Sequence, residues 1–142
     1  MSSLNCLIGE IVSGFVRTDF LISQIVYELQ LTGSRTAFFA DIRTRQKFND
    51  IKSKISKSVH PKKSEFIELL DQLDAIREKR NVIVHSLVLS EVGNDGNFSF
   101  HNYQQVRQGV VNKTEFYTLD DLEGIRDQVV SIHNAFYILH FE

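Results

Sequence analysis

The stretch KSEFIELLDQLDAIREKRNVIVHSL, residues 63–87, decides the fold class of this chain. Its apolar residues recur every three or four positions, the spacing that gathers side chains on one face of an α-helix. They are Phe66, Leu69, Leu70, Leu73, Ile76, Ile83, Val84 and Leu87. The segment therefore predicts an amphipathic helix whose apolar stripe packs against other helices.

Three further segments show the same helical spacing of apolar residues. They cover about residues 4–30, residues 37–58 and the stretch that follows Thr118. Thr118 is a favourable N-cap, and Asp120 and Asp121 would lie in the first turn, where the helix dipole stabilises negative charge. The sequence thus predicts four helices.

The character of the chain changes between the third and the fourth predicted helix. Residues 88–92 and 98–103 are rich in β-forming residues and flank the turn sequence GNDG at 93–96, while residues 115–117 predict a third short strand. The expected fold is mainly all-α, an antiparallel four-helix bundle with a small β-hairpin inserted before the last helix. A length of 142 residues suits a single domain, residues 1–142.

Composition excludes several classes of protein. Sixteen Lys and Arg against 18 Asp and Glu give a net charge of −2, which argues against a uniformly basic nucleic-acid binder. The one cysteine, Cys6, lies in the apolar first helix and is expected to be a core residue. Neither cysteine nor histidine spacing suggests a metal site, so we expect no metal and no cofactor. Without a signal peptide or membrane span, a cytoplasmic location is expected.

Arg80 interrupts the apolar stripe of residues 63–87. At 100° per residue it lies in the middle of the stripe, one turn after Ile76 and one turn before Val84. Burial of a charged guanidinium without a partner is costly. Arg80 should therefore reach solvent, meet a carboxylate, or lie where the stripe opens into a cleft or an interface. A purely structural ion pair within a monomer remains an alternative.

Asn81 and His85 lie one turn apart beside Arg80, and the three residue types suit RNA cleavage. Attack of a ribose 2′-hydroxyl on the neighbouring phosphate needs a base and an acid, and histidine serves both tasks near neutral pH. Arginine binds the phosphoryl oxygens as they gain charge, and asparagine can orient the phosphate or the imidazole. The spacing predicts a metal-independent catalytic site, although an Arg-Asn-x-x-x-His hexapeptide also occurs by chance.

The hexapeptide Arg80-Asn81-Val82-Ile83-Val84-His85 resembles the R-x4-6-H motif of the HEPN superfamily (higher eukaryotes and prokaryotes nucleotide-binding). Its placement on the third helix, before a hairpin and a last helix, agrees with that resemblance. The resemblance implies a homodimer in which two motifs share one cleft, with Arg80 and His85 as the catalytic pair and Asn81 in support. It also implies a metal-independent endoribonuclease, used as a toxin with a cognate antitoxin protein or as a defence effector.

Two features qualify what the resemblance implies. Some HEPN toxins carry a tyrosine two residues after the histidine, which the antitoxin modifies, whereas this chain has Leu87 there. Other HEPN domains do not cleave RNA and act as RNA-binding or scaffolding modules. A catalytically silent dimer that binds RNA or a partner protein is therefore the alternative function.

Positive charge is concentrated in residues 43–63. This segment holds eight Lys or Arg against the single acid Asp50, a net charge of +7. It is either a solvated helix face or a surface for an RNA backbone. The predicted RNA contacts are Arg43, Arg45, Lys47, Lys52 and Lys54 of this segment and Arg77 of the next helix.

Overall fold

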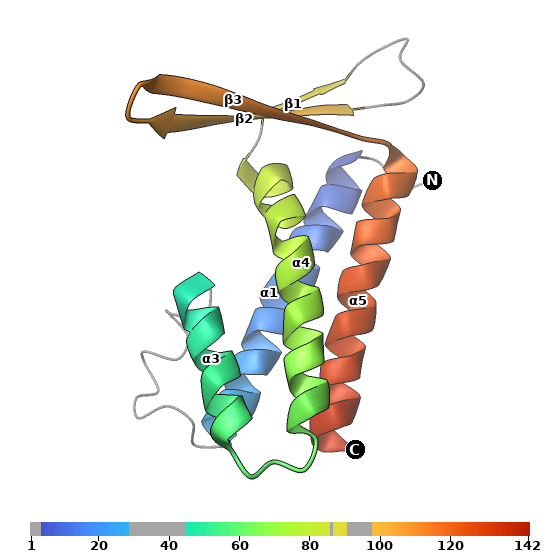
Figure 1. Ribbon diagram of the computed structural model, residues 1–142. Coiled ribbons are helices and arrows are strands. Elements are labelled where there is room, and N and C mark those ends of the chain that lie inside the picture. The colour runs from blue at the N-terminus through green and yellow to red at the C-terminus, as the bar shows by residue number, and fades with distance from the viewer. Residues whose placement is uncertain (1–3, 29–44, 86, 91–97) are drawn as a thin grey trace. The chain divides into compact units, whose positions relative to one another are not determined.

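The computed structural model describes residues 4–28, 45–85, 87–90 and 98–142 (Figure 1). Within them, the helices are α1 (Leu4–Glu28), α3 (Arg45–Lys57), α4 (Lys63–His85) and α5 (Leu119–Phe141). The strands are β1 (Leu87–Ser90), β2 (Phe98–Val106) and β3 (Gly109–Tyr117). The chain is mainly helical, with a small antiparallel sheet directly before the last helix, as predicted.

The predicted apolar stripes form the core. Ile11 and Phe15 of α1, Ile51 and Ile55 of α3, Phe66, Leu70, Leu73 and Ile76 of α4, and Leu122, Val129 and Phe136 of α5 are all buried. Cys6 is an exception, because it is exposed while its neighbour Leu7 is fully buried. The prediction of a core cysteine was wrong, since successive helix positions differ by about 100° in direction.

The start of α5 follows the predicted capping pattern and extends it. The Thr118 hydroxyl accepts a hydrogen bond from the Asp121 N–H at 3.0 Å, and the Asp121 carboxylate accepts one from the Thr118 N–H at 2.9 Å. This reciprocal pair satisfies backbone donors at the helix start. It fixes the point at which β3 ends and α5 begins.

The sheet is a three-stranded antiparallel meander in the order β1-β2-β3. Its longest pairing joins β2 to β3 from Phe98↔Tyr117 to Val106↔Gly109, across the two-residue turn Arg107-Gln108. Gly109 has a φ of 135°, a conformation that side chains disfavour. The predicted third strand of three residues is therefore a nine-residue strand, and the predicted turn at 93–96 lies outside the described residues.

The chain divides into two compact units, and α1, α4 and α5 each contribute to both. Unit 1 contains residues 1–13 and 76–128, hence the sheet and the end of α4. Unit 2 contains residues 14–75 and 129–142, hence α3. The expectation of a single domain remains a prediction.

Within unit 2, α1 and α5 run in the same direction. Gly14 of α1 approaches Val129 of α5, and Glu28 of α1 bonds His140 of α5 at 2.5 Å. The second contact lies further toward the C-terminal end of both helices, so the two helices are parallel. In a bundle of four helices in which each is antiparallel to the next, the first and the last would be antiparallel. The antiparallel arrangement of all four helices is therefore not confirmed.

None of the helices in the described part of the chain combines the length and the apolar character that crossing a bilayer requires.

Candidate functional site

The motif residues occupy the last two turns of α4, in unit 1. The helix ends at His85, and Arg80 and Asn81 lie five and four residues before it. Val82 and Ile83, which lie between Asn81 and His85 in the sequence, are 3% and 2% exposed, respectively. These two buried side chains anchor the backbone that carries the motif. The side chain of His85 lies outside the described part of the structure.

Arg80 reaches solvent from the apolar stripe. It is half-buried, and its Nη1 donates a hydrogen bond to the Asn81 Oδ1 at 3.1 Å. Arg80 is thus partly exposed and has a neutral oxygen among its partners, and it takes part in further interactions within the protein. The bond uses the amide oxygen of Asn81, so the exposed NH₂ group is the end suited to a phosphate oxygen.

The helix separates Arg80 from His85 in direction. Five positions at 3.6 residues per turn correspond to about 140° around the axis and about 7.5 Å along it. Asn81 is about 40° from His85, so these two share an edge. The backbone positions of Arg80 and His85 therefore lie on different sides of α4, and a site that uses both residues toward one phosphate is more easily built from two copies of α4.

Arg77 is not placed as a surface cation. It is 6% exposed and takes part in interactions within the protein. A buried guanidinium cannot reach a phosphate backbone unless its surroundings move. Arg77 is therefore better read as a structural residue than as an RNA contact, because its position one turn before Arg80 lies on the inner side of the helix.

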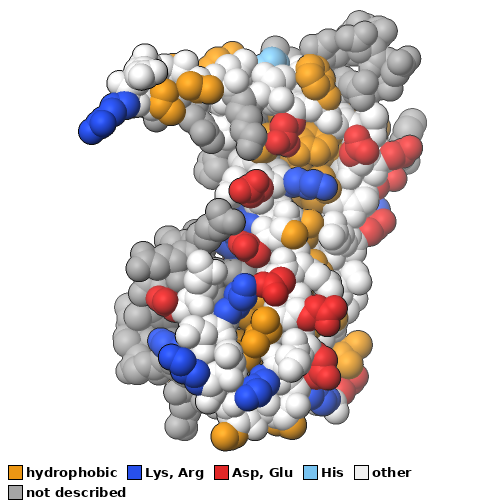
Figure 2. All heavy atoms as spheres, in the orientation of Figure 1, with side chains coloured by type: hydrophobic (Ala, Val, Ile, Leu, Met, Phe, Trp, Pro, Cys, Tyr) orange, Lys and Arg blue, Asp and Glu red, His pale blue; other side chains and the backbone are white. Residues whose placement is uncertain are grey.

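The described part of the basic segment is only partly available for RNA. Arg43 lies outside the described residues, as do the side chains of Arg45 and Lys47, whose backbone belongs to α3. The Lys52 ammonium forms an ion pair with the Asp71 carboxylate. Among the remaining cations, Lys54, Lys57, Lys62 and Lys63 are exposed. Figure 2 shows acidic and basic side chains interspersed over α3 and the start of α4.

Two histidines and an acid gather in unit 2: His60 of the α3–α4 connection, His140 near the end of α5, and Glu28, the last residue of α1. The rings of His60 and His140 stack with their centroids 6.5 Å apart, and Phe66 packs edge-on against His60 at 5.0 Å. Burial and the charges of His140 and Lys62 lower the pKa of His60. The hydrogen bond from His140 lowers the pKa of Glu28. No group of three or more His, Cys, Asp or Glu with metal-binding geometry is found among the described residues.

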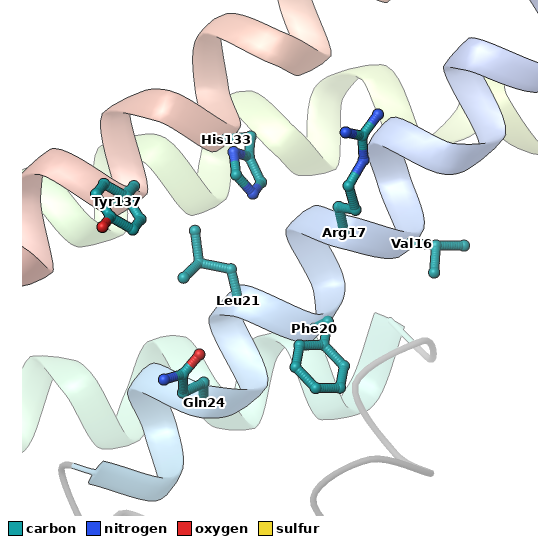
Figure 3. A pocket seen from close by; sticks show the side chains of 7 residues that line it. All are labelled: Val16, Arg17, Phe20, Leu21, Gln24, His133 and Tyr137. Carbon is teal, nitrogen blue, oxygen red and sulfur yellow. The ribbon is translucent and has the colours of Figure 1, made fainter.

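A surface pocket of about 460 Å³ lies between α1 and α5 in unit 2 (Figure 3). Its lining combines aromatic and aliphatic side chains with Arg17 and His133, and Phe20 and Tyr137 are about half exposed. Nothing in the sequence pattern singled it out, because Arg17 and His133 lie 116 positions apart. The pocket contains none of the predicted catalytic residues.

The sheet carries polar and aromatic residues that were not among the predicted site residues. His101 of β2 is bonded through its ring nitrogens to Ser99 and Thr114, and Tyr103 and Phe116 are largely exposed. On the opposite face, Tyr117 donates to the Glu115 carboxylate, and burial together with that acid raises the pKa of the phenol. The alternation of Ser99, His101 and Tyr103 in a predicted strand was the available signal.

Comparison of the chain with protein-family models, with curated proteins and with solved structures gives no match.

Proposed function

We propose that this chain is a metal-independent endoribonuclease of the HEPN type, which cleaves RNA as a homodimer and serves as a toxin or defence effector. The observation that carries the proposal is that Arg80, half-buried near the end of α4, is bonded to the exposed Asn81, which lies one turn before His85. A toxin would be held in check by a cognate antitoxin protein. The antiparallel packing of four helices is not part of the proposal, because α1 and α5 are parallel in unit 2.

The reaction assigns one proton transfer to each imidazole. The His85 imidazole of one copy takes the proton of a ribose 2′-hydroxyl, whose oxygen then attacks the neighbouring phosphorus. The P–O5′ bond breaks, and the imidazolium of the second copy protonates the departing oxygen. The products are a 2′,3′-cyclic phosphate and a 5′-hydroxyl.

Arg80 and Asn81 act on the phosphoryl group. The guanidinium stabilises the charge that accumulates on the non-bridging oxygens, and the Asn81 NH₂ group orients one of them. The roughly 140° between Arg80 and His85 on one helix supports a cleft between two copies. In this arrangement the Arg80 of one copy faces the phosphate, and the His85 of the other copy deprotonates the 2′-hydroxyl that attacks it.

RNA cleavage in excess EDTA tests the assignment. The wild type should cleave, and His85→Ala and Arg80→Ala should each lose about 100-fold or more in rate, the usual size of a general acid–base or electrostatic contribution. Lys79→Ala, which removes an exposed cation from the adjacent position of α4, is the matched control and should keep full activity. Full activity in both motif variants would refute the assignment.

A silent RNA-binding module is the second candidate. The observation that favours it is the set of four exposed lysines between Lys54 and Lys63, which bind phosphates without any catalytic group. The same assay separates the two functions. RNA that is bound in a salt-dependent manner and stays intact with the wild type supports the module.

A further inference from the structure

The register of β2 and β3 gathers a mixed aromatic and polar set of side chains on one face of the hairpin. The pairs Ser99↔Phe116, His101↔Thr114 and Tyr103↔Asn112 share this face, because successive strand residues alternate between faces. The opposite face carries Phe100 and Tyr117, which are 0% and 8% exposed. On the first face Ser99 is fully buried, while Tyr103, Asn112 and Phe116 are exposed. Apart from Ser99, the first face is therefore the solvated one.

Hydrogen bonds hold the His101 ring down along the sheet. Its Nε2 meets the Ser99 Oγ at 3.1 Å, and its Nδ1 meets the Thr114 Oγ1 at 3.0 Å and the Asn112 Nδ2 at 3.4 Å. Such bonds lie near the ring plane, and these partners are short side chains close to the sheet. A ring fixed between its own strand and the neighbouring strand lies along the sheet surface instead of standing away from it.

The Tyr103 ring continues this flat surface. It is inclined by only 21° to the His101 ring, and the two centroids are 6.5 Å apart. Tyr103 is 60% exposed, and Phe116, the diagonal neighbour of His101 on β3, is 59% exposed. Three rings thus lie along one face of the hairpin, and two of them are mostly open to solvent.

We propose that His101, Tyr103 and Phe116 form a platform on which bases of single-stranded RNA stack. The inference deepens the function proposed above and rests on it for the identity of the ligand. Each base has an aromatic face, and stacking on exposed protein rings is a main source of affinity for single strands. The platform would bind unpaired bases with little sequence preference.

The composition of this face favours RNA over a protein partner. Beside the rings lie neutral groups that donate and accept hydrogen bonds, the exposed Asn112 and the half-buried Thr114, which can meet base edges. None of the described positions on this face carries a carboxylate that would repel phosphates. The exposed Arg107 in the adjoining turn adds positive charge.

Binding of labelled oligouridine, measured by fluorescence anisotropy in the His85→Ala background, tests the platform without cleavage. Tyr103→Ala and Phe116→Ala should each weaken binding about tenfold, the usual loss for removal of one stacking ring. Tyr103→Phe should retain the wild-type affinity, because the ring is kept. Tyr137→Ala, which removes an exposed tyrosine from α5, is the matched control and should change nothing.

An abasic oligonucleotide of the same length separates stacking from phosphate attraction. The platform predicts that it binds at least tenfold more weakly than oligouridine and that Tyr103→Ala has no further effect on it. Equal binding of the two ligands, or unchanged binding of oligouridine by both ring variants, would overturn the platform. If the ring variants bind oligouridine as the wild type does but differ from it in oligomeric mass, this face would instead be assigned to a protein contact.

The two proposals can fail separately. If the wild type does not cleave RNA but the ring variants lose affinity, the platform stands and the ribonuclease assignment falls. If cleavage depends on Arg80 and His85 while the ring variants bind normally, the ribonuclease stands and the platform is wrong.

Discussion

Arg80 shows how a single charged residue on an apolar stripe finds a stable environment. Its neighbours Ile76 and Ile83 are 3% and 2% exposed, yet its own side chain is half-buried and bonded to Asn81. Arg77, one turn earlier, is buried instead. Periodicity placed Arg80 in the stripe, whereas Arg77 was predicted to contact RNA. The two positions differ by only about 60° around the helix, and their burial depends on neighbouring elements that periodicity does not specify.

Gly14 permits close packing of α1 against α5. A Cβ added there would lie 2.9 Å from the Val129 Cγ1, and Val129 is fully buried with a stiff β-branched side chain. Gly14→Ala should therefore lower the free energy of unfolding by about 1 kcal/mol, since overpacking outweighs the gain in helix propensity.

Gly9 of the same helix is the matched control for Gly14. It is exposed, and an added Cβ would meet nothing within 4 Å. Gly9→Ala should raise the free energy of unfolding by up to about 1 kcal/mol in urea denaturation. A Gly14→Ala variant as stable as Gly9→Ala would contradict the packing argument.

The elements were predicted more reliably than their ends and pairings. The predicted starts at residues 4 and 63 and the start after Thr118 agree with α1, α4 and α5. The third predicted helix is two residues too long, because Leu87 belongs to β1. Of the second predicted helix, 37–58, the described part is α3 at Arg45–Lys57. The pairing of β2 with β3 was underestimated, because residues 104–112 show little alternation and the turn depends on the positive φ of Gly109. The motif from Arg80 to His85 was located on its helix from sequence alone, while its surroundings depend on contacts that periodicity does not specify.

The connection between α3 and α4 contains a pH-sensitive contact. The Lys62 N–H donates to the His60 Nδ1 at 3.0 Å, which requires a neutral ring with its proton on Nε2. Because the pKa of His60 is lowered in the folded protein, the unfolded chain binds the proton more readily. The free energy of unfolding should then be highest above the ordinary histidine pKa of about 6.5 and fall as the pH drops from there through the lowered value.

The prediction for His60 is measured by urea denaturation between neutral and mildly acidic pH. His60→Asn keeps a side-chain acceptor for the Lys62 N–H without titrating, so its stability should fall less in this range. The lowered pKa of Glu28 acts in a separate, more acidic range, where stability is lost as that carboxylate is protonated. An equal pH dependence in the wild type and His60→Asn would exclude His60 as the cause.

At the scale of the whole molecule, the net charge of −2 conceals an uneven distribution. The segment 43–63 carries +7, so the other 121 residues carry −9 from eight basic and 17 acidic residues. Near neutrality therefore excludes a uniformly basic binder, but it leaves room for a local RNA surface. The exposed lysines after Lys52 are the solvent-accessible cations of this segment among the described residues.

The homodimer is tested by molecular mass in solution. Sedimentation equilibrium should give twice the chain mass of 16.4 kDa at the concentrations at which RNA is cleaved. The physical reason is that positions 80 and 85 lie about 140° apart around one α-helix, so the site proposed above is shared by two copies. Cleavage by a species of 16.4 kDa would contradict the shared cleft.

The parallel pairing of α1 with α5 has a consequence for how the chain folds. It joins residues that are 116 and 112 positions apart, Glu10 with Arg126 and Glu28 with His140, whereas the β2–β3 hairpin joins residues three to 19 positions apart. Closing long loops is slow, while hairpins form within about 1–10 μs. The hairpin can therefore form early, and the apolar stripe of α1 remains open to aggregation or chaperone binding until α5 covers it.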